Sequence, residues 1–180
     1  MIAVRRARDG DAAAIGGVHV AAWRSAYPGI LPDAYLAGLS VPRLQAYYAH
    51  AIRGRGLVFV AEGASRVVGF ATAGRGRWTD GLGRCPGEGE VETLYVLDDW
   101  RERGLGRALL RAAAAGLAEA GCRSVFLWVL SDNPSRWFYE RLGGRAVARA
   151  TVGVGGRAVA QTAIAWDPIE RLLETNARAK

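Results

Sequence analysis

The spacing of apolar and polar residues divides the chain into short strands and helices. Apolar residues at every second position, or in short continuous runs, predict strands, and a spacing of three to four predicts helices. The predicted strands are Ile2–Arg6, Leu57–Ala61, Val67–Ala73, Glu90–Leu97, Ser124–Leu130, Arg145–Val152 and Arg157–Trp166. The predicted helices are Ala12–Ser25, Pro32–Leu39, Pro42–Ile52, Gly104–Ala120, a short helix that begins at Asn133-Pro134 and ends at Gly143-Gly144, and Ile169–Lys180.

The order of these elements predicts a single α+β domain, an α/β mix in which helices flank one mixed sheet of about seven strands. No repeat and no second domain interrupts the pattern, so residues 1–167 form the predicted domain and residues 168–180 a C-terminal tail with helical character. The segment Gly74–Gly89 holds six glycines and is predicted as a loop. A loop of this length often covers a functional site.

The composition indicates a folded protein and excludes several kinds of chemistry. The chain has 180 residues, of which 51% are hydrophobic, so it can bury a core without disulfides. Its only lysine is Lys180, the last residue. Catalysis through a lysine Schiff base and a phosphate-binding P-loop are therefore excluded, because both need a lysine. The two cysteines, Cys85 and Cys122, form no C-x-x-C pair and indicate a reducing compartment. The two histidines, His19 and His50, cannot build a zinc site without carboxylates, and we expect no metal.

The sequence predicts neither a membrane segment nor a nucleic-acid-binding site. Its apolar stretches are shorter than the about 20 residues that cross a bilayer. The first residues lack the apolar stretch of a signal peptide, and we expect a soluble cytoplasmic protein. The net charge is +7, but the arginines are spread along the chain and no nucleic-acid-binding motif is visible. Nucleic acid is therefore not the expected partner.

Candidate chemistry begins where the strand Glu90–Leu97 runs through a polar turn into a glycine-rich helix start. The first backbone N–H groups of a helix are unpaired and the helix dipole adds positive potential, so a helix start can bind a pyrophosphate. Arg101, Arg103 and Arg107 add positive charge. The G-x-G triplet alone is weak because it occurs six times in the chain, and a tight strand-to-helix turn remains an alternative. A dinucleotide-binding fold is disfavoured because Leu109 stands where its motif needs a third glycine.

Three segments resemble the GNAT family of N-acetyltransferases. Residues 90–110 are similar to its acyl-CoA-binding motif, Q/R-x-x-G-x-G/A after a strand, which Arg101–Gly106 matches. Leu127–Gly144 is similar to the family's strand–Asn–helix segment ending in F-Y-E-+-L-G-F, with Gly144 in place of the final Phe. Trp23–Leu31 resembles a W-x-x-x-Y-x-G-x-L stretch of some members. The resemblance covers most of residues 2–166 and implies a twisted mixed sheet that splays beside its central strand, with acyl-CoA in the splay.

The resemblance implies acetyl-CoA as the co-substrate of an N-acetyltransferase. The strand backbone would contact the pantetheine arm and the thioester carbonyl, and the helix start would hold the pyrophosphate. The implied cofactor-binding residues are Leu94, Tyr95, Val96, Arg101, Glu102, Arg103, Gly104, Leu105, Gly106, Arg107 and Asn133. The family usually has an Asn seven residues before its catalytic Tyr. That spacing gives Asp132 here, so whether Asp132 or Asn133 fills the position stays open.

Tyr139 and two glutamates are the implied catalytic residues. Tyr139 would protonate the leaving thiolate, and the alternative is a core aromatic at a helix end. The acceptor amine must also lose a proton, which Glu90, Glu92 or water could take. Some members of the family place their base at the position of Glu90. Because side chains alternate along a strand, we expect Glu90, Glu92 and every second residue up to Val96 to share one face.

The acceptor site is the least specified part of the prediction. Trp23, Arg24, Tyr27 and the loop Gly74–Gly89 are expected to shape a pocket for a small-molecule or peptide amine, whose identity stays open. The acyl-chain preference and a homodimer also stay open. No covalent nucleophile is visible, so we expect direct attack by the amine in a ternary complex. The alternative function is a non-catalytic acyl-CoA-binding or nucleic-acid-binding module on the same fold, against which the presence of Tyr139 together with Glu90 argues.

Overall fold

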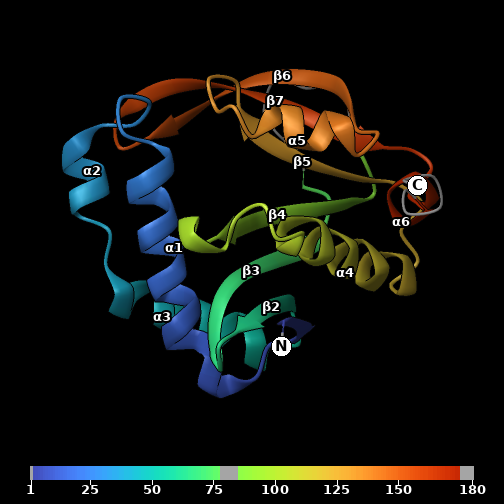
Figure 1. Cartoon of the computed structure of the whole chain (residues 1–180). Coiled ribbons are helices and arrows are strands. Elements are labelled where there is room, and N and C mark those ends of the chain that lie inside the picture. Colours follow the sequence, from blue (N-terminus) through green and yellow to red (C-terminus); the bar gives the residue numbers. More distant parts are fainter. Residues whose placement is uncertain (1, 78–84, 175–180) are drawn as a thin grey trace.

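The computed structural model describes residues 2–77 and 85–174, which form a seven-stranded sheet in the order β1-β2-β3-β4-β5-β7-β6 (Figure 1). Every strand expected from the sequence is present. The strands are β1 (Ile2–Arg6), β2 (Leu57–Gly63), β3 (Arg66–Arg75), β4 (Gly89–Val96), β5 (Val125–Leu130), β6 (Arg145–Val154) and β7 (Arg157–Trp166). The middle of the predicted loop, residues 78–84, lies outside the described residues.

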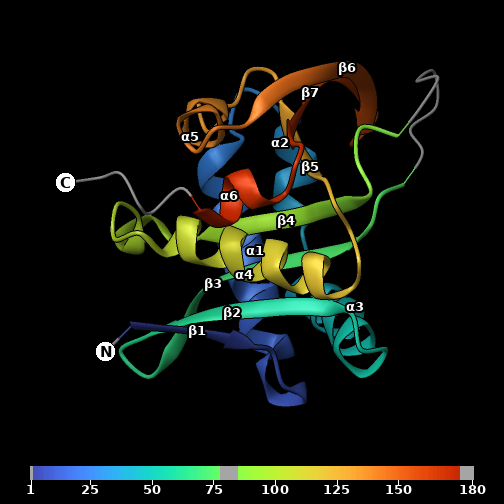
Figure 2. The same cartoon turned by 90° about the vertical axis from the view of Figure 1, so that its right-hand side faces the viewer.

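The helices cover both faces of the sheet. They are α1 (Ala12–Ala26), α2 (Asp33–Ala37), α3 (Val41–Arg53), α4 (Leu105–Glu119), α5 (Arg136–Arg141) and α6 (Glu170–Glu174), with one-turn 3₁₀ helices at Asp9–Asp11 and Asp98–Trp100. Helix α4 packs on one face, and α1 and α3 pack on the other (Figure 2). No helix within the described ranges is long and apolar enough to cross a membrane.

The sheet opens between its two central strands. β4 and β5 run parallel but pair only at Gly89 with Val125 and at Glu90 with Phe126. Beyond these pairs β5 bonds along its whole length to β7, while β4 bonds on its other side to β3. Figures 1 and 2 show the two halves of the sheet diverging from this point. The edge of β4 that faces β5 is therefore without a strand partner after Glu90, and a wedge opens beside it.

A β-bulge interrupts β4 inside this wedge. Thr72 of β3 lies opposite Thr93, but the next residue, Ala73, lies opposite Val91, so Glu92 is an extra residue with no partner across the pair. A bulge of this kind shifts the alternation of side chains by one residue. The side chain of Glu92 stays beside Thr72, whose hydroxyl lies 3.4 Å from its carboxylate.

The bulge contradicts the expectation that one face of the strand carries both glutamates and the residues up to Val96. Val91, Leu94 and Val96 all pack in the hydrophobic cluster beneath α4. Because Glu90 precedes Val91 directly, its side chain points to the opposite face, where Glu92 also lies. Strict alternation of side chains did not predict these faces, because one inserted residue moves every later side chain to the other face of the strand.

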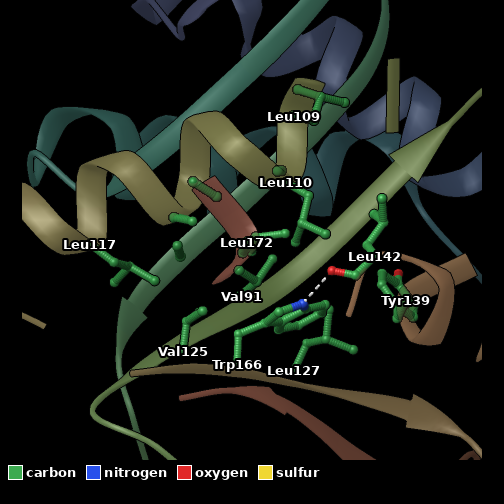
Figure 3. Packing of buried hydrophobic residues seen from close by; sticks show 14 of the residues in the cluster. Val91, Leu109, Leu110, Leu117, Val125, Leu127, Tyr139, Leu142, Trp166 and Leu172 are labelled. Atoms are coloured by element: carbon green, nitrogen blue, oxygen red, sulfur yellow. Dashed lines mark hydrogen bonds between the residues drawn. The ribbon is translucent and has the colours of Figure 1, made fainter. Parts of the chain in front are cut away.

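The main core lies between α4 and the sheet and includes Trp166, which is fully buried and donates its indole N–H to the carbonyl of Leu142 at 2.9 Å (Figure 3). A Cβ at Gly144 would lie 2.8 Å from the Trp166 ring and closer still to Ile164, so the core has no room here for the phenylalanine of the family motif. Ile169 and Leu172 are also fully buried in this core. The first part of the predicted tail therefore packs on the domain, and residues 175–180 lie outside the described residues.

Candidate active site

A cavity of about 390 Å³ occupies the wedge between β4 and β5. Its walls come from β4, β5, the end of α1, the start of α4 and the segment around α5. The site residues expected from the sequence that line it are Tyr27, Glu92, Leu94, Tyr95, Val96, Arg101, Glu102, Gly104, Leu105, Gly106, Arg107, Asn133 and Tyr139. Four other expected residues, Trp23, Arg24, Glu90 and Arg103, lie outside the lining.

The start of α4 forms one wall of this cavity. Gly104 precedes the helix in a left-handed conformation, with φ of 78°, which glycine adopts at little cost. The first helical bond runs from the N–H of Ala108 to the carbonyl of Gly104, and no side chain caps the start. The backbone N–H groups of Leu105 and Gly106 therefore have no acceptor within the helix, and both residues line the cavity together with Arg107. Unpaired donors at the positive end of a 15-residue helix form a site for an anion.

The arginines near the helix start differ in their surroundings. Arg101 lines the cavity and forms an ion pair with Asp98 at 2.8 Å. Arg107 also lines the cavity. The guanidinium of Arg103 instead lies 4.9 Å from the centre of the Trp100 ring, outside the lining. Two of the three predicted cations are thus placed beside the anion site.

The cavity narrows where α4 approaches α5. A Cβ at Gly106 would lie 3.3 Å from Cζ of Phe138, and both residues line the cavity. A larger side chain at Gly106 would enter the gap between the two helices. Glycine keeps the backbone of the helix start accessible from the cavity, which is what a bound phosphate needs.

Tyr139 is a buried tyrosine at the cavity wall. It is 8% exposed, and its ring makes edge contacts with Phe138 and Trp166. Burial raises the pKa of Tyr139, and the nearby Tyr27 hydroxyl raises it further. Among the described residues its hydroxyl has no hydrogen-bond partner. The phenol is therefore neutral at pH 7, and no acceptor within residues 2–77 and 85–174 holds its proton.

Asn133 rather than Asp132 faces the cavity. Its Oδ1 accepts a hydrogen bond from the backbone N–H of Ser135 at 2.9 Å, and its side chain is 9% exposed. Asp132 is exposed and outside the lining. Burial raises the pKa of Tyr27, whereas hydrogen bonding with Tyr95 and Asn133 lowers it. The loop after β5 thus accommodates the shorter spacing and brings Asn133 to the residues around the wedge.

The two glutamates share one arginine. Nε of Arg77 lies 3.2 Å from Glu90 and its Nη2 lies 3.3 Å from Glu92. These interactions raise the pKa of Arg77, the hydrogen bond with Glu90 contributing most. Only Glu92 lines the cavity, whereas Glu90 is 7% exposed and lies behind it. Arg77 was missed because it falls in the segment that the sequence predicts as a loop.

The three residues expected at the acceptor pocket have different positions. Tyr27 lines the cavity, and the ring of Trp23 packs edge-on against it at 5.1 Å between centres. Arg24 is exposed, and its guanidinium donates to the backbone carbonyls of Leu36 at 3.1 Å and Ala37 at 3.0 Å. Arg24 therefore holds the end of α2 and is not placed at the cavity. Its partners are backbone groups distant in sequence, which no local pattern reveals.

Residues 9–144 match the model of the acetyltransferase (GNAT) family. The chain belongs to this family. It is 32% identical over 174 residues to the uncharacterized N-acetyltransferase YuaI of Bacillus subtilis, a match that covers 96% of each chain. The N-acetyltransferase activity and the acetyl-CoA co-substrate expected from the sequence are confirmed by membership of the GNAT family.

Solved GNAT structures share this fold. The PaiA N-acetyltransferase of Thermoplasma acidophilum, in complex with coenzyme A, has a TM-score of 0.70 at 18% identity and covers 93% of this chain and 99% of its own. YncA of Salmonella typhimurium, a putative acetyltransferase with acetyl-CoA, has a TM-score of 0.67 at 24% identity. The match covers 99% of this chain and 98% of its own. The predicted single α+β GNAT fold is confirmed. Within residues 2–77 and 85–174, no three His, Cys, Asp or Glu side chains could hold a metal ion together.

Proposed function

We propose that this GNAT enzyme transfers an acetyl group from acetyl-CoA to a primary amine by direct attack in a ternary complex. One observation carries the proposal: a single cavity is lined by residues of the α4 start, by Tyr139 and by Glu92. An anion site, a proton donor and a carboxylate in one space are what amine acetylation from a thioester requires.

Acetyl-CoA fits the chemistry of these walls. Its pyrophosphate would accept from the N–H groups of Leu105, Gly106 and Arg107, with Arg101 nearby. Its pantetheine amides would bond to the edge of β4, which has no strand partner after Glu90. A free strand edge presents N–H and C=O groups to an extended ligand. The splayed sheet thus offers the thioester a backbone N–H that would stabilise the oxyanion during attack.

The proton donor of the proposed reaction is Tyr139. The amine nitrogen attacks the thioester carbonyl carbon, a C–N bond forms, the C–S bond breaks, and the thiolate leaves. Burial keeps Tyr139 protonated at pH 7, so its hydroxyl can donate to the sulfur as negative charge develops. Because the pKa of Tyr139 is raised above that of an ordinary thiol, we propose that it stabilises the thiolate through a hydrogen bond before the proton moves.

The acceptor's proton passes to Glu92 or to water. Both glutamates pair with Arg77, but Glu92 lines the cavity, whereas Glu90 is 7% exposed and outside the lining. Proximity to the amine is the first requirement for a general base. We therefore assign the base to Glu92 and give Glu90 the role of holding Arg77. Substitution of each glutamate by glutamine, described below, distinguishes this assignment from the opposite one.

The acceptor remains an amine of a small molecule or peptide. Tyr27 and the neighbouring Trp23 lie on the α1 side of the cavity, and we propose that they border the acceptor. A cytoplasmic location is part of the same proposal, because Cys85 and Cys122 are both free thiols. The opposing proposal is a GNAT module that binds acyl-CoA or nucleic acid without turnover, which predicts no reaction with any amine.

Thiol release from acetyl-CoA tests the function directly. The purified protein would be given acetyl-CoA with a panel of polyamines, amino acids, aminoglycosides and peptides with free N-termini. We expect at least one class to raise thiol release above the rate without amine, and the Tyr139→Phe variant to lose that increase. Bound acetyl-CoA at 100 times its Kd should also stabilise the fold by about 2.7 kcal/mol. Thermal stabilisation without amine-dependent release across the panel would support the binding module.

A further inference from the structure

The cavity reaches both faces of the splayed sheet. On β5, Leu127 and Val129 pack in the core beneath α4. Trp128 lies between them, so its side chain points to the opposite face, where it packs with Phe126. Phe126 pairs with Glu90 of β4 and therefore shares a face with it. Since Trp128 lines the cavity, the cavity has a wall on the α1 side of the sheet as well as at the start of α4.

Aromatic rings form much of the wall on the α1 side. Tyr27, Tyr95 and Trp128 all line the cavity. The ring of Trp23 supports the two tyrosines, with its centre 5.1 Å from that of Tyr27 and 6.2 Å from that of Tyr95. Trp128 stands edge-on to the fully buried ring of Phe126, with 6.3 Å between centres. Each lining ring is thus packed against another ring, which holds it in place.

The wedge is covered by apolar side chains beyond Tyr27. Tyr27 packs in one buried cluster with Leu36 of α2 and Val159 of β7. The turn between β6 and β7 also approaches α2, because a Cβ at Gly155 would lie 2.7 Å from Cβ of Tyr35. An acceptor that extends in this direction therefore meets apolar surface.

Charge is sparse on the α1 side of the cavity. Among the described residues that line it, Glu92 is the charged residue on this side. The other charged lining residues belong to the turn before α4, to α4 and to α5: Arg101, Glu102, Arg107 and Arg141. The carboxylate of Glu92 lies 3.3 Å from the guanidinium of Arg77, which also pairs with Glu90. A second ammonium on the acceptor would find no second carboxylate in this wall and would be repelled by Arg77.

We infer that the acceptor is a primary monoamine attached to an aromatic or other apolar group, and that Trp128 is the residue that selects it. The amine would lie at Glu92, and its carbon group would pack on the rings of Trp128 and Tyr27. The inference rests on the acetyl transfer proposed above and adds the class of acceptor. Polyamines and aminoglycosides, which carry several cations, are the classes that it excludes.

Three acceptors that differ at one carbon test this class in the wild-type enzyme. Butylamine, 4-phenylbutylamine and 1,4-diaminobutane carry hydrogen, a phenyl ring or a second amine four carbons from the reacting nitrogen. We expect kcat/KM to be about tenfold higher for 4-phenylbutylamine than for butylamine, because its ring is buried against an aromatic wall. We expect 1,4-diaminobutane to be the poorest acceptor of the three.

Trp128→Ala tests the residue to which the selection is assigned. It should lower kcat/KM for 4-phenylbutylamine about tenfold, mainly through KM, and bring it close to the value for butylamine. The KM for acetyl-CoA should be unchanged, which also shows that the variant is folded. Trp128→Phe keeps a ring and should keep most of the preference. Trp137→Ala is the matched control, because Trp137 is 59% exposed and outside the lining.

Arg77→Gln tests the exclusion of a second cation. Its readout is the ratio of kcat/KM for 1,4-diaminobutane to that for butylamine, in which any disturbance of Glu92 itself cancels. We expect this ratio to rise about threefold when the guanidinium is removed. An unchanged ratio would contradict the charge argument.

The outcomes separate this inference from the proposed function. Equal kcat/KM for the three acceptors, or the highest value for 1,4-diaminobutane, would overturn the inference while acetyl transfer itself stands. If no amine is acetylated, the proposed function fails, and calorimetric titration of the enzyme–CoA complex still tests the pocket. There 4-phenylbutylamine should bind about tenfold more tightly than butylamine and lose this advantage in Trp128→Ala. Equal binding of the two amines would overturn the inference.

Discussion

Because His19 is buried, the free energy of unfolding of this enzyme should fall in mild acid. The size of the fall follows from the pKa of His19 in the native and unfolded states. Burial lowers the pKa of His19 from 6.5 to about 4. Between pH 6.5 and about pH 4, His19 binds a proton in the unfolded chain but not in the native state. Stability contributed by the neutral histidine is therefore complete above pH 6.5 and falls as the pH decreases. Linkage gives a loss of about 2 kcal/mol by pH 5 and about 3 kcal/mol by pH 4.

The comparison that isolates this effect uses His19→Gln and His19→Phe, neither of which titrates. Urea unfolding followed by tryptophan fluorescence would give the free energy of unfolding of all three proteins at pH 7, 5 and 4. We expect the wild type to lose about 2 and then about 3 kcal/mol more than either variant, while all other titrating groups cancel. A difference between wild type and variants that is constant with pH would refute the argument that the histidine is buried and neutral.

Five further substitutions test the cavity and the core. Tyr139→Phe should lower kcat by about 10²- to 10⁴-fold in steady-state assays, with acetyl-CoA affinity unchanged. Gly106→Val should abolish the rise in melting temperature caused by acetyl-CoA, because its side chain enters the gap against a phenylalanine ring 3.3 Å from Cβ. Glu92→Gln should lower the rate of acetyl transfer near pH 7 and recover it at high pH, where the amine deprotonates unaided. Glu90→Gln should lower this rate only slightly. The reverse ranking would move the base to Glu90. Gly144→Phe should lower the free energy of unfolding by at least about 1–3 kcal/mol in urea titrations, since the site is already filled.

Local patterns were enough to place the elements of this fold. Helix α4 follows from its apolar spacing and from Gly104, and the β6–β7 hairpin follows from two alternating runs around Gly155-Gly156. The anion site could be predicted for the same reason, because a strand, a polar turn and a helix start are adjacent in sequence. Of the cofactor-binding residues predicted within 90–110, all line the cavity except Arg103, which lies against Trp100.

The acceptor side was harder to predict because it depends on contacts between distant segments. One inserted residue at Glu92 changes which face of β4 each side chain occupies, and no composition marks such a bulge. Arg24 reaches backbone carbonyls of α2, and His19 of α1 lies 2.7 Å from the Tyr48 hydroxyl of α3. The choice between Asp132 and Asn133 needed the path of the loop after β5, which spacing alone does not fix.

The most direct test of the central claim follows the acetyl group itself. Acetyl-CoA labelled in its acetyl carbons would be mixed with enzyme and the amine that best stimulates thiol release, and the products would be analysed by mass spectrometry at a single turnover. Direct attack predicts that the amine carries the labelled acetyl group on nitrogen and that the enzyme keeps its unmodified mass throughout. A labelled acetyl group on the enzyme before it appears on the amine, or no label on the amine at all, would contradict the account.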